Sequence, residues 1–403
     1  MPETGFVRGS AGYRRAGLAL SLAGAGTFAL LYTTQALLPL LSREFDVSPT
    51  TASLSLSLTT GALALALVPA SAVAARWGTA RVMRASLAAA AVLGVLAALA
   101  PSFELLLLAR TLQGVAIAGV PALGMAYMGR VVDGRSMGAA VGLLVAGNTV
   151  GGLSGRLISS TVADAAGWRW AIASVGVVAL ACLALFWWLL PRDGNAVRER
   201  TTAGVRPHLK AHLRDSGLLR LFAISFVLMS AFVSVYNYLT FRLLAAPFEF
   251  SQTVVGLVFL VYLPGTLAST VAGRLGDRLG RRRMLWASLL VAQVAVLVTL
   301  PDQPVLVVVG LVLFTVGFFA AHTVASSWVT RRASSGREQA SSLYLLAYYL
   351  GSSIGGFGSG FAFDAAGWPG VVAVVSALLA VALILGLSLR TLVPAATRTA
   401  AIP

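Results

Sequence analysis

The sequence predicts an all-α membrane protein with twelve transmembrane helices in two pseudo-symmetric six-helix bundles. Hydrophobic residues make up 58% of the chain and charged residues only 11%, which leaves too little polar surface for a soluble domain. The apolar residues form repeated runs, each long enough to cross a hydrocarbon core about 30 Å thick. In addition, short strings from the first half of the chain return in the second half at a nearly constant offset.

Apolar runs bounded by charged residues, Gly or Pro define the predicted spans. They cover residues 17–41, 50–74, 85–101, 105–128, 136–162, 168–190, 218–242, 252–273, 284–300, 304–328, 339–363 and 368–389. The first run follows Arg14 and Arg15, as in a signal peptide, but more hydrophobic segments come after it, so we interpret it as an uncleaved span. Buried helices of a large soluble enzyme are the alternative, and a dozen such runs argue against it.

The formal net charge of +16 follows membrane topology. With the N-terminus inside, all but five of the 30 Lys and Arg residues fall in predicted cytoplasmic segments; the exceptions are Arg43, Arg110, Arg156, Arg169 and Arg242. This positive-inside bias predicts that both termini are cytoplasmic and that membrane lipid is a partner. The basic residues carry no nucleic-acid recognition motif, so we expect no nucleic-acid partner.

The polar stretch 192–217 divides the chain into a bundle over 1–191 and a bundle over 218–403, and it behaves as a cytoplasmic linker. The string from Asp164 to Trp168 returns from Asp364 to Trp368. Two further sets of residues match in the same way: Gly147, Gly151 and Gly152 with Gly351, Gly355 and Gly356, and Arg76-Trp77-Gly78 with Arg278-Leu279-Gly280. Duplicated six-helix units are a transporter architecture in which a central substrate path opens alternately to either side.

Enzyme, receptor and cofactor functions lack support in the sequence. The single Cys182 excludes an internal disulfide and a cysteine metal cluster. A membrane-embedded enzyme would need a nucleophile, a metal site or an acid–base pair at membrane depth, and none is apparent. We therefore expect no catalytic residue, no metal and no cofactor.

Several motifs resemble those of the major facilitator superfamily. The segment Gly273 to Arg282 is similar to the family's loop signature, and Leu107 to Gly114 is similar to its second motif. The segment Gly147 to Gly152 resembles the antiporter motif with Asn148 in place of Pro, and in the first half Ala75 stands where the loop signature has Asp. Over its whole length the chain is similar to the twelve-helix bacterial drug and sugar efflux permeases, in particular arabinose-efflux-permease-like inner-membrane transporters.

The resemblance implies that Asp277 closes an inner gate by contacting span 11. The gating residues would then be Gly273, Asp277, Arg278, Gly280 and Arg281. A carboxylate favours the positive N-terminus of a neighbouring helix and nearby arginines. The alternative is that Asp277 is a solvated loop charge.

An arginine inside a span raises the free energy of the folded protein unless its guanidinium has a hydrogen-bonding or charged partner. The resemblance implies that Arg110 acts as a relay or substrate contact, with Gln113 on the same helix face. Alternatively, Arg110 fixes helix packing through carbonyls of span 5. We expect Arg156 to form a structural ion pair with Asp164 or Glu104.

Proton coupling rests on the resemblance and on His322, the histidine that lies within a predicted span and whose titration range suits proton transfer. A packing role for His322 is the alternative. All fourteen Asp and Glu residues fall in loops or near span ends, so no carboxylate is available at mid-membrane depth.

Polar and aromatic residues at cavity depth suit a neutral or weakly polar organic solute. They are Tyr32, Gln35, Asn148, Tyr236, Asn237, Tyr344 and Tyr348. Interfacial anchoring is the alternative for each Tyr. The Gly-rich stretch from Gly351 to Gly360 lacks a phosphate-loop signature and predicts close helix packing.

Taken together, these patterns predict a monomeric secondary active transporter in the bacterial cytoplasmic membrane. It would export a small organic solute, a drug-like compound or a sugar, by proton-coupled antiport and alternating access. Uptake or facilitated diffusion of a small nutrient is the alternative.

Overall fold

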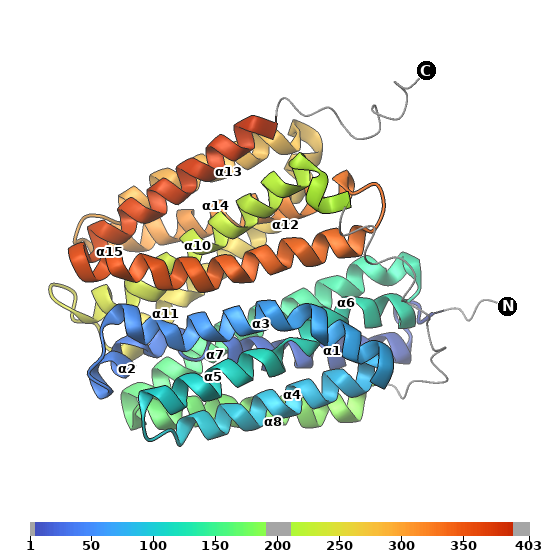
Figure 1. Cartoon of the computed structure of the whole chain (residues 1–403), viewed down its shortest axis with the longest axis horizontal. Helices are drawn as coiled ribbons and strands as arrows, with labels where there is room; N and C mark the ends of the chain where they lie inside the picture. The colour runs from blue at the N-terminus through green and yellow to red at the C-terminus, as the bar shows by residue number, and fades with distance from the viewer. Residues whose placement is uncertain (1–4, 191–210, 390–403) are drawn as a thin grey trace. The chain divides into compact units, whose positions relative to one another are not determined.

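The computed structural model describes residues 5–190 and 211–389, and within these ranges the regular elements are helices (Figure 1). Within the same ranges, Phe6 and Val132 form an isolated β-bridge. Ten helical segments of the described chain are long and apolar enough to cross a membrane. The all-helical prediction is therefore confirmed, while residues 192–210 of the predicted linker lie outside the described residues.

The helices of the first half carry six of the predicted spans. Their bounds are α1 Ala11–Tyr32, η1 Gln35–Leu37, α2 Leu38–Glu44, α3 Pro49–Trp77, α4 Thr79–Ala98, α5 Phe103–Ile117, α6 Gly119–Val131, η2 Gly134–Ser136, α7 Met137–Ala166 and α8 Trp168–Leu189.

The second half has fewer and longer helices. Their bounds are α10 Ser216–Leu244, α11 Gln252–Leu257, η3 Val258–Val261, α12 Tyr262–Leu279, α13 Arg281–Val298, α14 Pro304–Arg332 and α15 Arg337–Ser388. The predicted spans 11 and 12 form the single element α15, which is broken at Gly367 (φ 59°, ψ −144°). The predicted span 9 corresponds to α13, whose three leading arginines distinguish it from the ten apolar segments.

Three predicted spans are interrupted, and each interruption comes shortly before a proline. α1 gives way to η1 and α2 before Pro39, α5 gives way to α6 before Pro121, and η3 gives way to α12 before Pro264. Proline lacks the N–H that would bond to the carbonyl four residues earlier, so the helix must deviate there. The sequence contained this signal, although the apolar runs were continuous.

The chain forms two compact units, each described here by itself. Unit 1 consists of Met1–Val47, Leu54–Thr201 and Ser251–Leu257, and unit 2 consists of Ser48–Ser53, Thr202–Phe250 and Val258–Pro403. Each unit thus contains one short segment from the other half of the sequence. These segments are the start of α3, which belongs to unit 2, and all of α11, which belongs to unit 1.

Glycines allow close helix packing at equivalent places in the two units. In unit 1 a Cβ added to Gly147 or Gly151 would lie closer than 3.0 Å to the backbone of Ser21 or Ala25 in α1. In unit 2 a Cβ at Gly351 would meet the backbone of Phe226 in α10 just as closely. The pairs α1–α7 and α10–α15 are therefore in near backbone contact, as small residues permit in membrane helices.

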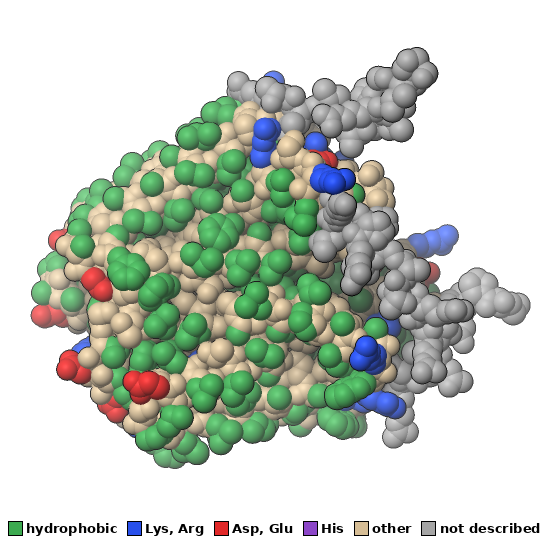
Figure 2. All heavy atoms as spheres, viewed as in Figure 1, with side chains coloured by type: hydrophobic (Ala, Val, Ile, Leu, Met, Phe, Trp, Pro, Cys, Tyr) green, Lys and Arg blue, Asp and Glu red, His purple; other side chains and the backbone are tan. Residues whose placement is uncertain are grey.

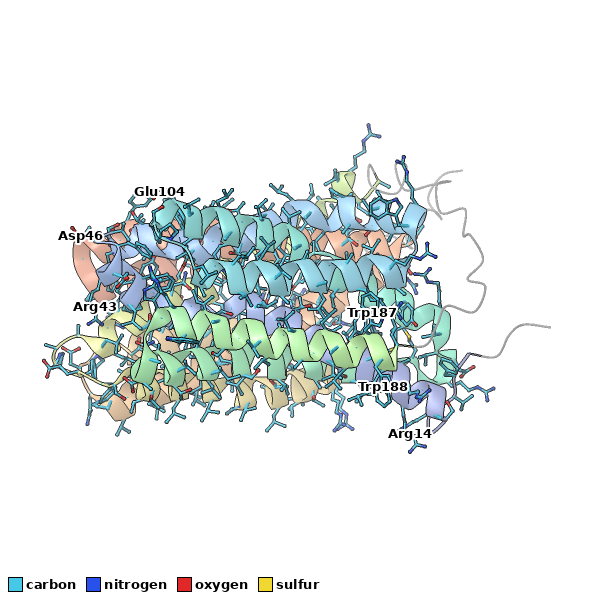
Figure 3. The ribbon with its side chains drawn as sticks, turned by 90° about the horizontal axis from the view of Figure 1, so that it is seen from below. Arg14, Arg43, Asp46, Glu104, Trp187 and Trp188 are labelled. Atoms are coloured by element: carbon cyan, nitrogen blue, oxygen red, sulfur yellow. The ribbon has the colours of Figure 1, made fainter. Side chains whose placement is uncertain are left out.

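Charged side chains separate to opposite ends of the helices. In unit 1, Arg14, Trp187 and Trp188 lie at one end, whereas Asp46 and Glu104 lie at the other (Figure 3). In unit 2, α13 runs from the arginines at 281–283 towards Asp302, and α14 returns to arginines at 331 and 332. We call these the basic end and the acidic end of each unit.

Between their ends the helices expose apolar side chains. On the face shown in Figure 2, hydrophobic side chains cover the lengths of the helices and charged side chains lie near the ends. Leu65 is 69% exposed and Leu267 is 71% exposed although both lie inside helices. Such exposure is costly in water, so these surfaces are expected to face lipid.

Candidate substrate and coupling site

Arg110 in α5 is buried within unit 1 and is held by backbone carbonyls. Its Nη1 donates to Leu30 O at 2.9 Å, its Nη2 to Leu31 O at 2.8 Å and its Nε to Ser55 O at 3.1 Å. Nη1 also donates to Oε1 of Gln113. Only 1% of Arg110 is exposed, so its charge is stabilised by peptide dipoles and an amide inside the bundle.

These acceptors correct the packing alternative drawn from the sequence. The carbonyls belong to α1 and α3, not to span 5, which is α7. Gln113 is fully buried and its Nε2 donates to Ala90 O in α4 at 2.8 Å. Arg110 and Gln113 therefore join α5 to three other helices of unit 1.

Arg156 in α7 lies beside two of the predicted cavity residues. Its Nε donates to Oε1 of Gln35 at 2.7 Å, and its Nη1 donates to Gly152 O at 2.7 Å. Its guanidinium carbon lies 4.0 Å from the ring centroid of Tyr32, which is a cation–π contact. The structure thus gathers Tyr32 and Gln35 around a 2%-exposed guanidinium, a role the sequence had not given to Arg156.

The acids that were expected near Arg156 have other contacts. Oδ2 of Asp164 accepts hydrogen bonds from Oγ1 of Thr253 at 2.7 Å and from its backbone N–H at 3.2 Å. Glu104 lies in the first turn of α5, at the acidic end. Because Arg156 donates to an amide and a carbonyl, it is better placed to act as a polar group of a binding site than as an interfacial ion pair.

Asn148, which replaces Pro in the antiporter-like motif, lies in α7 against Gly24 of α1. Its Oδ1 is buried and has no hydrogen-bond partner among the described residues. A buried polar atom without a partner costs about 1–3 kcal/mol. Asn148 is therefore a candidate contact for a solute or for a water molecule.

In unit 2, His322 of α14 lies between two tyrosines of α15. Its Nδ1 is 3.0 Å from Oη of Tyr344, and its ring centroid is 4.9 Å from that of Tyr348. The hydroxyl of Tyr344 also donates to His322 O at 3.3 Å. Three predicted site residues thus form one cluster, which the four-residue spacing of the tyrosines makes possible.

An aromatic row connects this cluster to Tyr236 of α10. The ring of Phe318 is stacked on His322 at 6.0 Å and on Phe232 at 3.9 Å, and Phe232 lies 4.8 Å from Tyr236. The hydroxyl of Tyr236 contacts Oγ1 of Thr315. The sequence analysis did not include Phe232 and Phe318, although their four-residue spacing from Tyr236 and His322 was a usable signal.

Asn237 follows Tyr236 in α10 and is fully buried. Its carbonyl accepts a hydrogen bond from Oγ1 of Thr240 at 2.8 Å. Adjacent residues of a helix point about 100° apart, so Asn237 and Tyr236 do not share a face. The structure therefore places Tyr236, but not Asn237, in the aromatic row.

The predicted gating residues lie at the basic end of unit 2. Oδ1 of Asp277, in α12, accepts from Nη2 of Arg281 at 2.5 Å and from Nη2 of Arg331 at 3.2 Å. Gly280 links α12 to α13 with φ 91°, and Arg278 occupies the last turn of α12. The ion pairs of Asp277 are thus with α13 and α14, whereas the family resemblance implied span 11, the first part of α15.

The remaining gating candidate, Gly273, lies one turn earlier in α12, where an added Cβ would be 3.9 Å from Thr323 of α14. Within residues 5–190 and 211–389, no group of three or more His, Cys, Asp or Glu side chains could hold a metal ion.

Helical bundles with apolar flanks and buried polar clusters are the architecture of a polytopic membrane protein. The family model of the Major Facilitator Superfamily matches residues 20–244 and 237–401. The chain belongs to the Major Facilitator Superfamily, and it is a transporter of a small-molecule substrate rather than an enzyme.

Similar proteins agree with this assignment. The chain is 40% identical over 394 residues to the inner membrane transport protein YnfM of Escherichia coli (strain K12), covering 96% of this chain and 94% of that protein. It is 38% identical over 377 residues to the uncharacterized MFS-type transporter YybF of Bacillus subtilis (strain 168), covering 93% of each. A bacterial homolog of the human lysosomal transporter Spinster shares the fold, with TM-score 0.77 and 17% identity over 95% of this chain and 98% of that chain.

Proposed function

We propose that this transporter exports a small organic solute across the bacterial cytoplasmic membrane by alternating access, in exchange for protons. The observation that carries the proposal is the cluster of His322, Tyr344 and Tyr348 at one end of the aromatic row in unit 2. It combines a flat apolar surface with hydroxyl and imidazole groups. Pockets for drug-sized solutes have this composition.

Unit 1 contains polar groups that can also bind a solute. Arg156, Gln35 and Tyr32 form a hydrogen-bonded cation–π group, and Asn148 offers an acceptor from the same helix as Arg156. Arg110 has a positioning role, because its hydrogen bonds go to carbonyls and to Gln113. These groups suit a neutral or weakly polar solute that carries a few hydrogen-bonding atoms.

His322 is the proposed proton carrier. Among the described residues, the buried ionisable side chains include Arg110, Arg156 and Arg242 but no Asp or Glu. A guanidinium keeps its proton, so an arginine cannot carry the coupled proton. The imidazole of His322 lies within a span, and imidazole is a side chain that can both take up and release a proton.

The test of coupling is substrate-dependent proton flux in reconstituted vesicles. Drug-like compounds and sugars are screened, and flux is then measured for His322→Gln, which keeps a polar side chain that cannot titrate. The matched control is His212→Gln, since His212 is a buried histidine outside the spans whose Nε2 is 3.0 Å from Gly336 O. We expect His322→Gln to lower proton flux at least tenfold and His212→Gln to change it less than twofold. Equal flux in the two variants would remove His322 as the carrier.

The direction of transport is tested in the same system. Export in exchange for protons predicts that an acidic exterior drives solute out of right-side-out vesicles, and that an acidic lumen drives solute into inside-out vesicles. Uptake or facilitated diffusion of a nutrient is the competing function, and it predicts accumulation in right-side-out vesicles or no response to the gradient.

Gating by the basic end of unit 2 is part of the proposal. The hinge between α12 and α13 is Gly280, flanked by Arg278 and Arg281, and the two ion pairs of Asp277 hold that hinge. The fifth proposed gating residue, Gly273, lies one turn before Asp277 in α12. Asp277→Asn should lower the transport rate about tenfold at equal expression, while membrane insertion stays normal. Wild-type flux in this variant would contradict a gating role.

The proposed orientation places both termini in the cytoplasm and treats the protein as a monomer. Cysteine labelling tests the orientation, because Cys182→Ser leaves a background without cysteine to which one cysteine can be added at Arg206. Labelling by a membrane-impermeant reagent only in inside-out vesicles supports a cytoplasmic loop. Light scattering of the detergent complex tests the monomer.

A further inference from the structure

A pocket of about 440 Å³ lies at the basic end of unit 2, beside the hinge between α12 and α13. Four arginines line it: Arg281, Arg282, Arg283 and Arg331. Asp277 is the acid among its lining residues, so the lining carries a formal net charge of +3. The remaining wall is partly apolar and includes Trp328, Leu279 and Leu389.

Three of the pocket's arginines contact neighbouring groups. Asp277 is bonded to Arg281 at 2.5 Å and to Arg331 at 3.2 Å, so it fixes two guanidiniums on the same side of the pocket. The guanidinium carbon of Arg282 lies 5.7 Å from the ring centroid of Trp286. One carboxylate cannot neutralise four guanidiniums, and the excess charge favours an anion.

The backbone adds to the attraction for an anion. Gly280 caps α13 with φ 91°, so the 18-residue helix begins at Arg281 with its free N–H groups at the pocket. The first turn of a helix carries partial positive charge and favours phosphate. The arginines are an independent and larger source of positive charge at the same place.

The apolar wall indicates what carries the anion. Leu279 is 54% exposed, and Trp328 continues the surface without a charged atom. A free phosphate would leave this wall in contact with water. A phospholipid would place its phosphodiester among the guanidiniums and its glycerol and first methylenes on the wall, where a basic pocket meets the bilayer surface.

We propose that this pocket binds the headgroup of an anionic phospholipid. The guanidiniums match phosphate geometry, and Arg282 and Arg283 bring charge that Asp277 does not neutralise. This inference concerns a lipid site and does not depend on which solute is transported or in which direction.

Native mass spectrometry of the full-length protein, titrated with phosphatidylglycerol and separately with phosphatidylcholine, tests the proposal. The variant is Arg282→Gln/Arg283→Gln, and the matched control is Arg14→Gln/Arg15→Gln, another adjacent exposed pair at a basic end. We expect the double variant in the pocket to weaken phosphatidylglycerol binding about 30-fold, because each basic residue near a headgroup contributes about 1 kcal/mol, or about fivefold. The control should change binding less than twofold.

A second variant tests the sign of the effect. Asp277→Asn removes the competing carboxylate, so it should tighten phosphatidylglycerol binding about fivefold, whereas a loss of folding would weaken it. Equal binding of phosphatidylcholine and phosphatidylglycerol would overturn the proposal. So would equal losses in the pocket variant and the control, or inorganic phosphate binding as tightly as the lipid.

Discussion

The two six-helix repeats have kept the same contacts at their acidic ends and have diverged at their basic ends. Asp164 and Asp364 occupy equivalent positions of the repeated string. Asp164 accepts from Thr253 at the start of α11, and Oδ2 of Asp364 accepts from Oγ1 of Thr50 at the start of α3, at 2.5 Å. In both repeats a carboxylate therefore binds the first turn of another helix.

At the basic ends the backbone has been kept but the charge has not. Gly78 and Gly280 have φ of 89° and 91°, so the two hinges have the same left-handed geometry. Beside the second hinge, Asp277 forms ion pairs with Arg281 and Arg331. Beside the first hinge, the equivalent position is Ala75, and Arg130 instead donates to Oγ1 of Thr79. Glycine is thus present at both hinges, because the positive φ requires it, whereas the carboxylate is present at only one of them.

The interiors of the repeats have also separated. Unit 1 buries Arg110 and Arg156 in hydrogen-bonded polar groups, and unit 2 buries an aromatic row that ends at His322. One repeat has thus acquired a polar interior cluster and the other an aromatic one. Four sets of substitutions can break or sharpen this comparison.

Removing the buried guanidinium of unit 1 should have the largest effect. Arg110→Ala leaves the carbonyls of Leu30, Leu31 and Ser55 without donors and opens a cavity, so we expect it to destabilise the protein by about 3–5 kcal/mol. Thermal unfolding in detergent measures the loss. Arg43→Ala, at an exposed arginine of the acidic end, should change the melting temperature little. Similar melting temperatures for both variants would show that Arg110 does not hold unit 1 together.

Glycine packing should give the next effect. Gly151→Ala forces a Cβ against the backbone of Ala25 and should cost about 2–3 kcal/mol. Gly142 lies in the same helix, and a Cβ added there would have no neighbour within 4 Å. Gly142→Ala should therefore stabilise the protein slightly, because alanine favours the helical conformation. Gly351→Ala should resemble Gly151→Ala if the repeats pack alike, and unequal losses would break the comparison there.

The paired acidic contacts should give smaller and equal effects. Asp164→Asn and Asp364→Asn each weaken a charge-assisted hydrogen bond, so each should lower the free energy of unfolding by about 1.5 kcal/mol. The double variant should show the sum, because the two contacts lie in different units. A loss in only one of the single variants would mean that the contacts are not equivalent.

The smallest expected effect is a pH dependence at the start of α10 in unit 2. Ser10 caps α1 with a neutral hydroxyl, whereas Asp215 caps α10 and bonds to Arg332 at 2.8 Å. Partial burial would raise the pKa of Asp215, but the hydrogen bond from Arg332 and those from backbone N–H groups lower it below the ordinary 3.8.

A lowered pKa means that the stabilisation is present at neutral pH and is lost as the pH falls through the folded-state value. We expect Asp215→Asn to cost about 1 kcal/mol at pH 7, because solvent screens this partly exposed pair, and less at about pH 3. Unfolding measured at both pH values checks the sign. Ser10→Ala should lose the same stability at both.

Much of the site geometry could be anticipated from helix periodicity, since four-residue spacing placed Tyr344 and Tyr348 on one face near His322. The hydrogen-bond partners of the buried arginines could not be anticipated from the sequence. Arg110 bonds to carbonyls of α1 and α3, and a carbonyl carries no residue-specific signal in the sequence. Arg156 reaches Gln35, 121 positions away, and only packing brings the two together.

The sequence by itself determined that the chain enters a membrane, that it is helical and duplicated, and which superfamily it belongs to. The first three properties follow from hydrophobic runs and repeated strings, because each span must satisfy its backbone hydrogen bonds within its own helix. The superfamily follows from the motif resemblance of Gly273 to Arg282, Leu107 to Gly114 and Gly147 to Gly152. Only the tertiary structure decided which buried polar groups meet and that Asp277 pairs with Arg281 and Arg331 beside a basic pocket. Such contacts depend on the rotation and depth of neighbouring helices, which side-chain packing sets and a single apolar run does not encode.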